Sequence, residues 1–171
     1  TLFVLLLTDL LQIKIILKDA NVVVVTKAIQ AAGLLTKGLR QEFSGEAKFL
    51  VAALLGKFKE KKATVVTAIN ETLDLMTNTC FTIADITEDL TAAVDDKVPQ
   101  VRENTLAFIT RFIVMKNCQR AIVGTVINVL APLFMKAMDD GIPGVREAAY
   151  KAFGQLVSQQ RNVLPCCLVF S

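Results

Sequence analysis

Apolar side chains recur along this chain at intervals of three and four residues. One stretch is formed by Ala47, Leu50, Val51, Leu54 and Leu55, and similar stretches run from 126 to 137 and from 145 to 156. Residues spaced in this way lie on one face of an α-helix. Strand-like alternation is nowhere sustained, so the pattern predicts an all-α fold.

These stripes and the turns between them predict eight helices in about four antiparallel pairs. Their expected bounds are Leu2–Leu17 with Val22–Arg40, Glu46–Leu55 with Ala63–Thr77, Ile83–Val94 with Pro99–Met115, and Ala121–Met138 with Pro143–Ser158. Pro99 and Pro143 suit the first turn of a helix, where the backbone N–H that proline lacks has no partner. Pro132 falls inside a predicted helix, so we expect a kink there, opposite the carbonyl of Asn128.

One phrase of the sequence occurs twice. Asp95–Glu103 returns as Asp139–Glu147, an offset of 44 residues (139 − 95 = 44), and Lys59–Val65 and Lys18–Val24 align with it more weakly. A period near forty residues is typical of helix pairs stacked into a solenoid, in which the turns within the pairs emerge along one edge. The turns expected there are Lys18–Asn21, Lys57–Lys62, Asp95–Val98 and Asp139–Ile142.

Composition limits the chemistry that this fold could carry. The chain has 53% hydrophobic residues, no histidine, and a net charge of +3. Histidine is the commonest general base and metal ligand, and no glycine-rich phosphate loop or nucleophile motif is present, so we expect neither an enzyme nor a cofactor or metal site. The cysteines lack paired CxxC spacing, so Cys80, Cys118, Cys166 and Cys167 are expected to be free thiols.

Positive charge gathers at the expected turns. Lys57–Lys62 contains four lysines, and Lys97, Arg102 and Arg146 lie at or just after the later turns. A line of positive charge along one edge suits an acidic protein surface. Simpler interpretations stay open, because a lysine-rich turn is often only solvated.

Other residues have structural interpretations. Asp96 and Asp140, with Arg102 and Arg146, could bond to the backbone and to each other between repeats. Four phenylalanines on the apolar stripes are expected in the core, namely Phe108, Phe112, Phe134 and Phe153.

The two ends of the sequence lack polar cover. Residues 1–171 are expected to form a single domain that is truncated at both ends. The first helix should expose an apolar patch formed by Leu2, Phe3, Leu5 and Leu6, because terminal repeats of a solenoid need polar caps. A signal peptide is the alternative interpretation of this run, which is too short to span a bilayer.

Several of these motifs together resemble a known family. Asp-x4-Val-Arg within a helix pair resembles a HEAT repeat. Together, Gly38-Leu39-Arg40, Lys57–Lys62, Asp96–Pro99 and Gly141–Ala149 resemble a TOG domain of the ch-TOG and Minispindles type of microtubule polymerase, with the second TOG domain as the suggested counterpart.

That resemblance implies a paddle of HEAT repeats whose intra-repeat turns bind a curved αβ-tubulin heterodimer without covalent chemistry. It implies a cytoplasmic protein of the cytoskeleton, at microtubule plus ends, the spindle and the centrosome. The tubulin contacts that it implies are Lys18, Asp19, Asn21, Val22, Lys59, Lys61, Lys62, Lys97, Val98 and Arg146.

Two alternative functions remain. A generic HEAT-repeat scaffold would present its edge or concave face to another protein. A basic solenoid could touch nucleic acid or anionic lipid, but no aromatic residues interleave with the lysines to stack on bases. We therefore expect neither nucleic acid nor a membrane as partner, and a monomeric domain within a longer protein.

Overall fold

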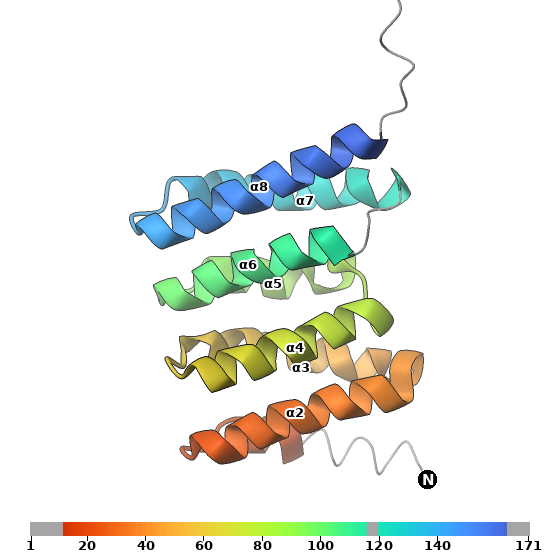
Figure 1. The fold of residues 1–171 in the computed structure, drawn as a ribbon, viewed down its shortest axis with the longest axis vertical. Coiled ribbons are helices and arrows are strands. Elements are labelled where there is room, and N and C mark those ends of the chain that lie inside the picture. The colour runs from red at the N-terminus through yellow and green to blue at the C-terminus, as the bar shows by residue number, and fades with distance from the viewer. Residues whose placement is uncertain (1–11, 116–119, 164–171) are drawn as a thin grey trace, which may run out of the picture.

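The computed structural model describes residues 12–115 and 120–163, which form a stack of helices without a strand in these ranges (Figure 1). Residues 12–16 are helical. The helices that follow are α2 (Val22–Leu39), α3 (Ser44–Gly56), α4 (Ala63–Thr79), α5 (Thr87–Val94), α6 (Pro99–Met115), α7 (Arg120–Met138) and α8 (Pro143–Val163). Short 3-10 segments occupy Arg40–Phe43, Lys57–Lys59 and Ile83–Ile86. The predicted all-α solenoid is confirmed.

The helices form two layers. In Figure 1, α2, α4, α6 and α8 lie in front of α3, α5 and α7. Within the front layer α2 packs on α4, α4 on α6, and α6 on α8. Each pair therefore contacts mainly the pairs next to it in sequence, as expected for a solenoid.

The predicted helix Leu2–Leu17 lies mostly outside the described residues. The other predicted bounds hold to within two residues, except in two helices. The predicted helix Ile83–Val94 is a 3-10 turn, Ile83–Ile86, followed by α5. A capping box between Thr82 and Asp85 starts the 3-10 turn. Helix α8 runs to Val163 rather than ending at Ser158. Helix α7 continues through Pro132, and the kink there stays a prediction.

The helical run Val22–Lys59 is long and apolar enough to cross a membrane, judged by length and composition alone. A reversal at Arg40, whose φ is 50°, divides this run between the two layers. The buried side of α2 includes Ile29 and Gly33 and packs on α4, where the Thr72 hydroxyl donates to the Ile29 carbonyl at 3.0 Å. A Cβ at Gly33 would lie 3.0 Å from Thr72 Oγ1, so glycine allows this close approach.

The core follows the predicted stripes. The five residues of the first stripe, Ala47 to Leu55, are all buried, as are Phe108, Phe112 and Phe134. Phe153 is 38% exposed, so its assignment to the core was wrong. Helix α8 packs on α6 and α7 through the side that carries Val145, Ala149, Ala152 and Leu156, and Phe153 lies at the margin of that side.

Several sequence-based expectations lie outside the described residues. These are the apolar patch at Leu2, Phe3, Leu5 and Leu6, the thiols of Cys118, Cys166 and Cys167, and the side chains of Val126 and Val129. Cys80 is described, and it is a buried free thiol. Burial raises the pKa of this thiol, which disfavours the thiolate, its nucleophilic form.

Candidate functional site

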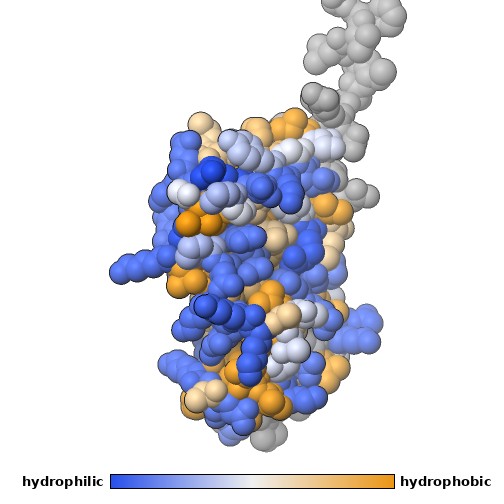
Figure 2. Space-filling view, turned by 60° about the vertical axis from the view of Figure 1, so that its left-hand side comes forward, coloured by the Kyte–Doolittle hydropathy of each residue, from blue (hydrophilic) through white to orange (hydrophobic). Residues whose placement is uncertain are grey.

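The four turns within the helix pairs gather along one edge of the stack, as the repeat predicts. This edge is on the left in Figure 1, where α2, α4, α6 and α8 all begin. Figure 2 brings the same side forward and shows a mostly hydrophilic surface with separate apolar patches. We call the residues 18–22, 57–62, 95–98 and 139–146 the turn edge.

The first turn is held by its own side chains. The Asn21 N–H donates to Asp19 Oδ1 at 2.7 Å, and the Val23 N–H donates to Asn21 Oδ1 at 3.0 Å. Asn21 is therefore the N-cap of α2. Lys18, Asp19 and Asn21 are exposed, Val22 is half-buried, and Val23 is 67% exposed. Asp19 and Asn21 thus stabilise the turn through hydrogen bonds and are at the same time accessible to a partner.

The second turn presents the lysines. Lys59, Lys61 and Lys62 are exposed, and they form no salt bridge with any residue that the structure describes. Lys57 instead lies 3.5 Å from Glu60. Three of the four lysines therefore offer free positive charge.

The lysine turn is anchored by an apolar side chain that the sequence reasoning missed. Phe58 lies in the middle of the turn and is fully buried, and its 3-10 segment packs on α3, α4 and α6. The position of Phe58 between lysines could have indicated this anchor. When an aromatic side chain in a charged turn is buried, the charged side chains beside it face the solvent.

The third turn has the same local geometry as the first. The Val98 N–H donates to Asp96 Oδ1 at 2.8 Å. Lys97 is exposed and Val98 is half-buried. Behind the turn, Lys136 of α7 lies 2.7 Å from Asp95, a pair that the sequence did not predict.

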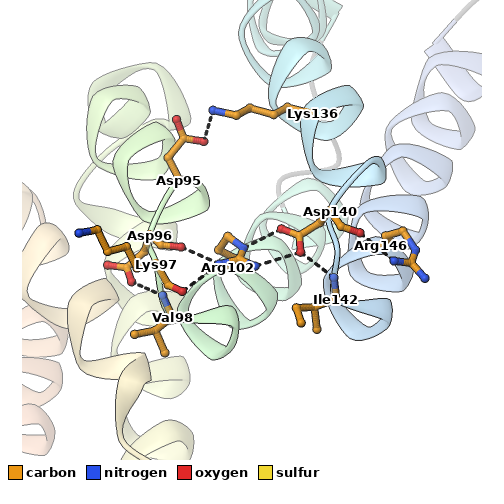
Figure 3. Close-up of polar contacts among 9 residues, drawn as sticks. All are labelled: Asp95, Asp96, Lys97, Val98, Arg102, Lys136, Asp140, Ile142 and Arg146. Carbon is orange, nitrogen blue, oxygen red and sulfur yellow. Dashed lines mark hydrogen bonds and ion pairs between the residues drawn. The ribbon is translucent and has the colours of Figure 1, made fainter.

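Arg102 joins the third pair to the fourth (Figure 3). Its Nε and Nη2 donate to the two carboxylate oxygens of Asp140, at 2.7 and 2.9 Å, while Nη1 donates to the Asp96 carbonyl at 2.8 Å. The side chain of Arg102 is 15% exposed and that of Asp140 is 14% exposed. The structural interpretation of Arg102 and Asp140 is therefore confirmed.

Arg146 repeats only part of this arrangement. Its Nη1 donates to the Asp140 carbonyl at 2.7 Å, as Arg102 does to the Asp96 carbonyl. The Asp140 carboxylate also accepts from the Ile142 N–H at 2.9 Å (Figure 3). Arg146 is half-buried, and its remaining N–H groups have no partner among the described residues. It supports the turn and keeps free hydrogen-bonding capacity.

A polar groove of about 540 Å³ lies between the third and fourth turns. Its lining includes Asp95, Lys97, Arg102, Lys136 and Asp140. Apart from Lys97, the basic side chains in it are paired with carboxylates. Among the described residues, the free lysines of the turn edge are therefore Lys97, Lys18 and the three of the lysine turn. Within the described ranges, no cluster of three or more histidine, cysteine or carboxylate side chains could hold a metal ion.

The Arg102–Asp140 pair predicts how stability responds to acid. Hydrogen bonds from Arg102 hold the pKa of the Asp140 carboxyl below its usual value. A group whose pKa is lowered by folding adds stability above its unfolded pKa of about 3.9, and this contribution is lost as pH falls through the lower folded value. Asp140→Asn should therefore lower the free energy of unfolding at pH 7 by about 1–3 kcal/mol. It should also make stability less dependent on pH below about 4.

Urea titrations from pH 7 to pH 2 would measure both effects. Asp139→Asn, at the exposed neighbouring position, is the matched control and should stay within about 0.5 kcal/mol of the wild type. Equal pH profiles for Asp140→Asn and the wild type would exclude a stabilising charge pair.

The chain matches the family model described as CLASP N terminal over residues 6–162. It is 37% identical over 145 residues to Protein MOR1 of Arabidopsis thaliana, covering 84% of this chain and 7% of that protein. It is 35% identical over 144 residues to Protein mini spindles of Drosophila melanogaster, again covering 84% of this chain and 7% of that protein. The chain thus spans about 7% of the length of each of these two relatives.

A solved structure has a similar fold. The described chain is similar to one solved in work on tubulin recruitment and assembly by microtubule polymerases with Tumor Overexpressed Gene (TOG) domain arrays, with a TM-score of 0.77 and 28% identity. The match covers 88% of this chain and 31% of that one. From the family model, these relatives and this likeness, the chain belongs to the CLASP N-terminal family and is a TOG domain of the mini spindles type.

Proposed function

We propose that this chain is a non-catalytic tubulin-binding domain, and that the turn edge binds the αβ-tubulin heterodimer. The observation that carries the proposal is the lysine turn, which places three ammonium groups, without a salt bridge to any described residue, on the edge where all four turns gather. The likeness to a chain from tubulin-recruiting TOG arrays supports the choice of partner.

The lysines among the proposed tubulin contacts are exposed on the turn edge, where a bound protein could reach them. Lys59, Lys61 and Lys62 would steer an acidic tubulin surface toward the edge, because exposed charges act mainly on encounter and register. Lys97 would extend the same line of charge to the third turn. Val22 and Val98, both half-buried, would form the apolar contacts beside it.

Lys18, Asp19, Asn21 and Arg146 complete the proposed contact set. Each of the last three also makes a local hydrogen bond that shapes its turn. Their contribution would therefore be partly indirect, through the position of the backbone at the edge.

In the longer protein, several such domains would act together to promote microtubule growth, in the cytoplasm and at plus ends, the spindle and the centrosome. Linked binding modules reach a higher overall affinity than any one of them alone. A single domain of this kind need bind tubulin only moderately.

Gel filtration with soluble tubulin tests the proposal. The chain should co-elute with tubulin at low salt and progressively less as salt rises, because screening shortens the range of exposed charges to about 8–10 Å near physiological salt. Free elution at every salt concentration, with a folded chain by far-UV circular dichroism, would favour the generic HEAT-repeat scaffold over a tubulin-binding domain.

A further inference from the structure

Carboxylates lie at corresponding points of the four turns. Oδ1 of Asp19, of Asp96 and of Asp140 accepts the backbone N–H two residues further on, at 2.7, 2.8 and 2.9 Å. Glu60 occupies the same position in the lysine turn when Lys59–Val65 is aligned with Asp95–Val101. The turns differ in the group that neutralises each carboxylate.

The carboxylate of Asp140 is bound from the preceding helix pair. Arg102, in the first turn of α6, donates to it through Nε and Nη2, at 2.7 and 2.9 Å. The planar guanidinium meets both carboxylate oxygens, and such two-point contacts are among the stronger polar contacts in proteins. The junction between the third and fourth pairs therefore shows how an arginine side chain lies against a turn carboxylate.

The junction between the second and third pairs lacks this arginine. The aligned turns are offset by 36 residues (96 − 60 = 36), so Arg102 corresponds to Val66 in the first turn of α4. Val66 is half-buried against the core, and its side chain has no group that could donate to a carboxylate. In Figure 3 the carboxylates of Asp96 and Asp140 both point toward the preceding pair, so Asp96 faces this junction.

Asp96 has no counter-charge among the described residues. Its side chain accepts one hydrogen bond there, from the Val98 N–H, and it forms no salt bridge. At the junction before it, Glu60 has Val25 at the position that corresponds to Arg102, but Lys57 lies 3.5 Å from Glu60. Asp96 is half-buried, so part of its surface is open to a bound protein.

We propose that Asp96 binds an arginine side chain of the protein that docks on the turn edge, in the geometry that Arg102 has on Asp140. This inference rests on the proposed function and adds a requirement on the partner. The partner surface must place a guanidinium close to the acidic patch that the lysine turn attracts. Two neighbouring contacts of opposite sign would fix the register of the complex, because a shifted partner would bring like charges together.

The sign of one charge change separates this inference from simple attraction. If Asp96 were only a negative charge on an edge that binds an acidic surface, removing the charge would strengthen binding. If Asp96 binds an arginine, removing the charge weakens binding. Asparagine is a suitable replacement, because Asn21 Oδ1 accepts the Val23 N–H at 3.0 Å, the same type of bond that Asp96 makes to Val98.

Binding titrations with soluble tubulin at one moderate salt concentration test the inference. Asp96→Asn should weaken binding by about tenfold, because a charge-assisted hydrogen bond is lost. Val66→Arg should bring a guanidinium of the chain itself to Asp96, which should raise the melting temperature and weaken binding. This rise should vanish when Asp96→Asn is added. Glu71→Gln, which removes a negative charge at an exposed position in the middle of α4, is the matched control and should bind as the wild type.

The outcomes are distinct. Equal or stronger binding by Asp96→Asn overturns the inference, and so does a Val66→Arg chain that is more stable yet binds as the wild type. If Val66→Arg fails to fold, Asp96→Asn decides alone, and its melting temperature should stay close to that of the wild type. A wild-type chain that does not bind tubulin at all overturns the proposed function itself, whereas a wild type that binds beside an unaffected Asp96→Asn overturns this inference alone.

Discussion

Replacing Lys59 and Lys61 together by glutamate is expected to abolish co-elution of the chain with soluble tubulin. Both side chains are exposed, and neither has a salt-bridge partner among the described residues, so their charge is available to a bound protein. Reversal removes two attractive interactions and adds two repulsive ones, and like charges across an interface cost several kcal/mol. A loss of at least a hundredfold in affinity, or roughly 3 kcal/mol, is therefore expected.

The measurement is gel filtration at low and moderate salt, with tubulin in excess. The double variant should keep the melting temperature of the wild type, since exposed substitutions usually change stability by about 0.5 kcal/mol or less. Lys37→Glu with Lys151→Glu reverses the same amount of charge at exposed positions away from the turn edge and should leave binding intact. Undiminished binding by the Lys59 and Lys61 variant would move the binding surface elsewhere on the stack.

Phe58→Ala is expected to have the largest effect on stability. The ring is fully buried beneath the lysine turn, where the 3-10 segment Lys57–Lys59 meets α3, α4 and α6. Removing a buried phenylalanine side chain costs about 3–5 kcal/mol, because apolar burial is lost and a cavity is left. The turn should also lose its fixed position, so tubulin binding should weaken even where the chain remains folded.

Urea unfolding would measure the change in free energy, and gel filtration below the unfolding transition would measure binding. Phe49→Ala is the matched control, because Phe49 on α3 is 72% exposed. Its ring face lies near the Lys14 ammonium group, with 5.3 Å between Nζ and the ring centroid. Its cost should be no more than about 1 kcal/mol. Similar unfolding midpoints for the two alanine variants would contradict an anchoring role for Phe58.

The repeat in the sequence was sufficient to predict the helix pairs and the edge that joins their turns. Pro99 and Pro143 begin their helices as predicted, because the first turn is the position in a helix that proline favours. The 3-10 segment at the start of the third pair was not predicted. The capping box at Thr82 and Asp85 marks where the helical segment begins, but it does not tell whether the first turn is 3-10 or α.

The errors in the predicted core and site have a common cause. Phe153 lies on an apolar stripe, yet a stripe does not tell how many neighbours cover it, and the described residues cover only one side of α8. The turn sequence offered bonding between repeats as one interpretation of Arg102 and Asp140, and the structure shows that pair. It gave no sign of the pair between Lys136 and Asp95, because these residues lie far apart in the sequence.

The stacking of each pair on its neighbours also has a mechanical consequence. Interfaces in series behave as springs in series, so deformation concentrates in the softest one. Salt bridges tie α6 to α4 and to the fourth pair, through Arg111 and Arg102, whereas α2 and α4 share no salt bridge among the described residues. The contact between α2 and α4 is held instead by close packing at Gly33 and by the buried hydrogen bond from Thr72 to the Ile29 carbonyl. Screening of the salt bridges by dissolved ions should therefore soften the contacts of the third pair first, and the edge would adapt its curvature there.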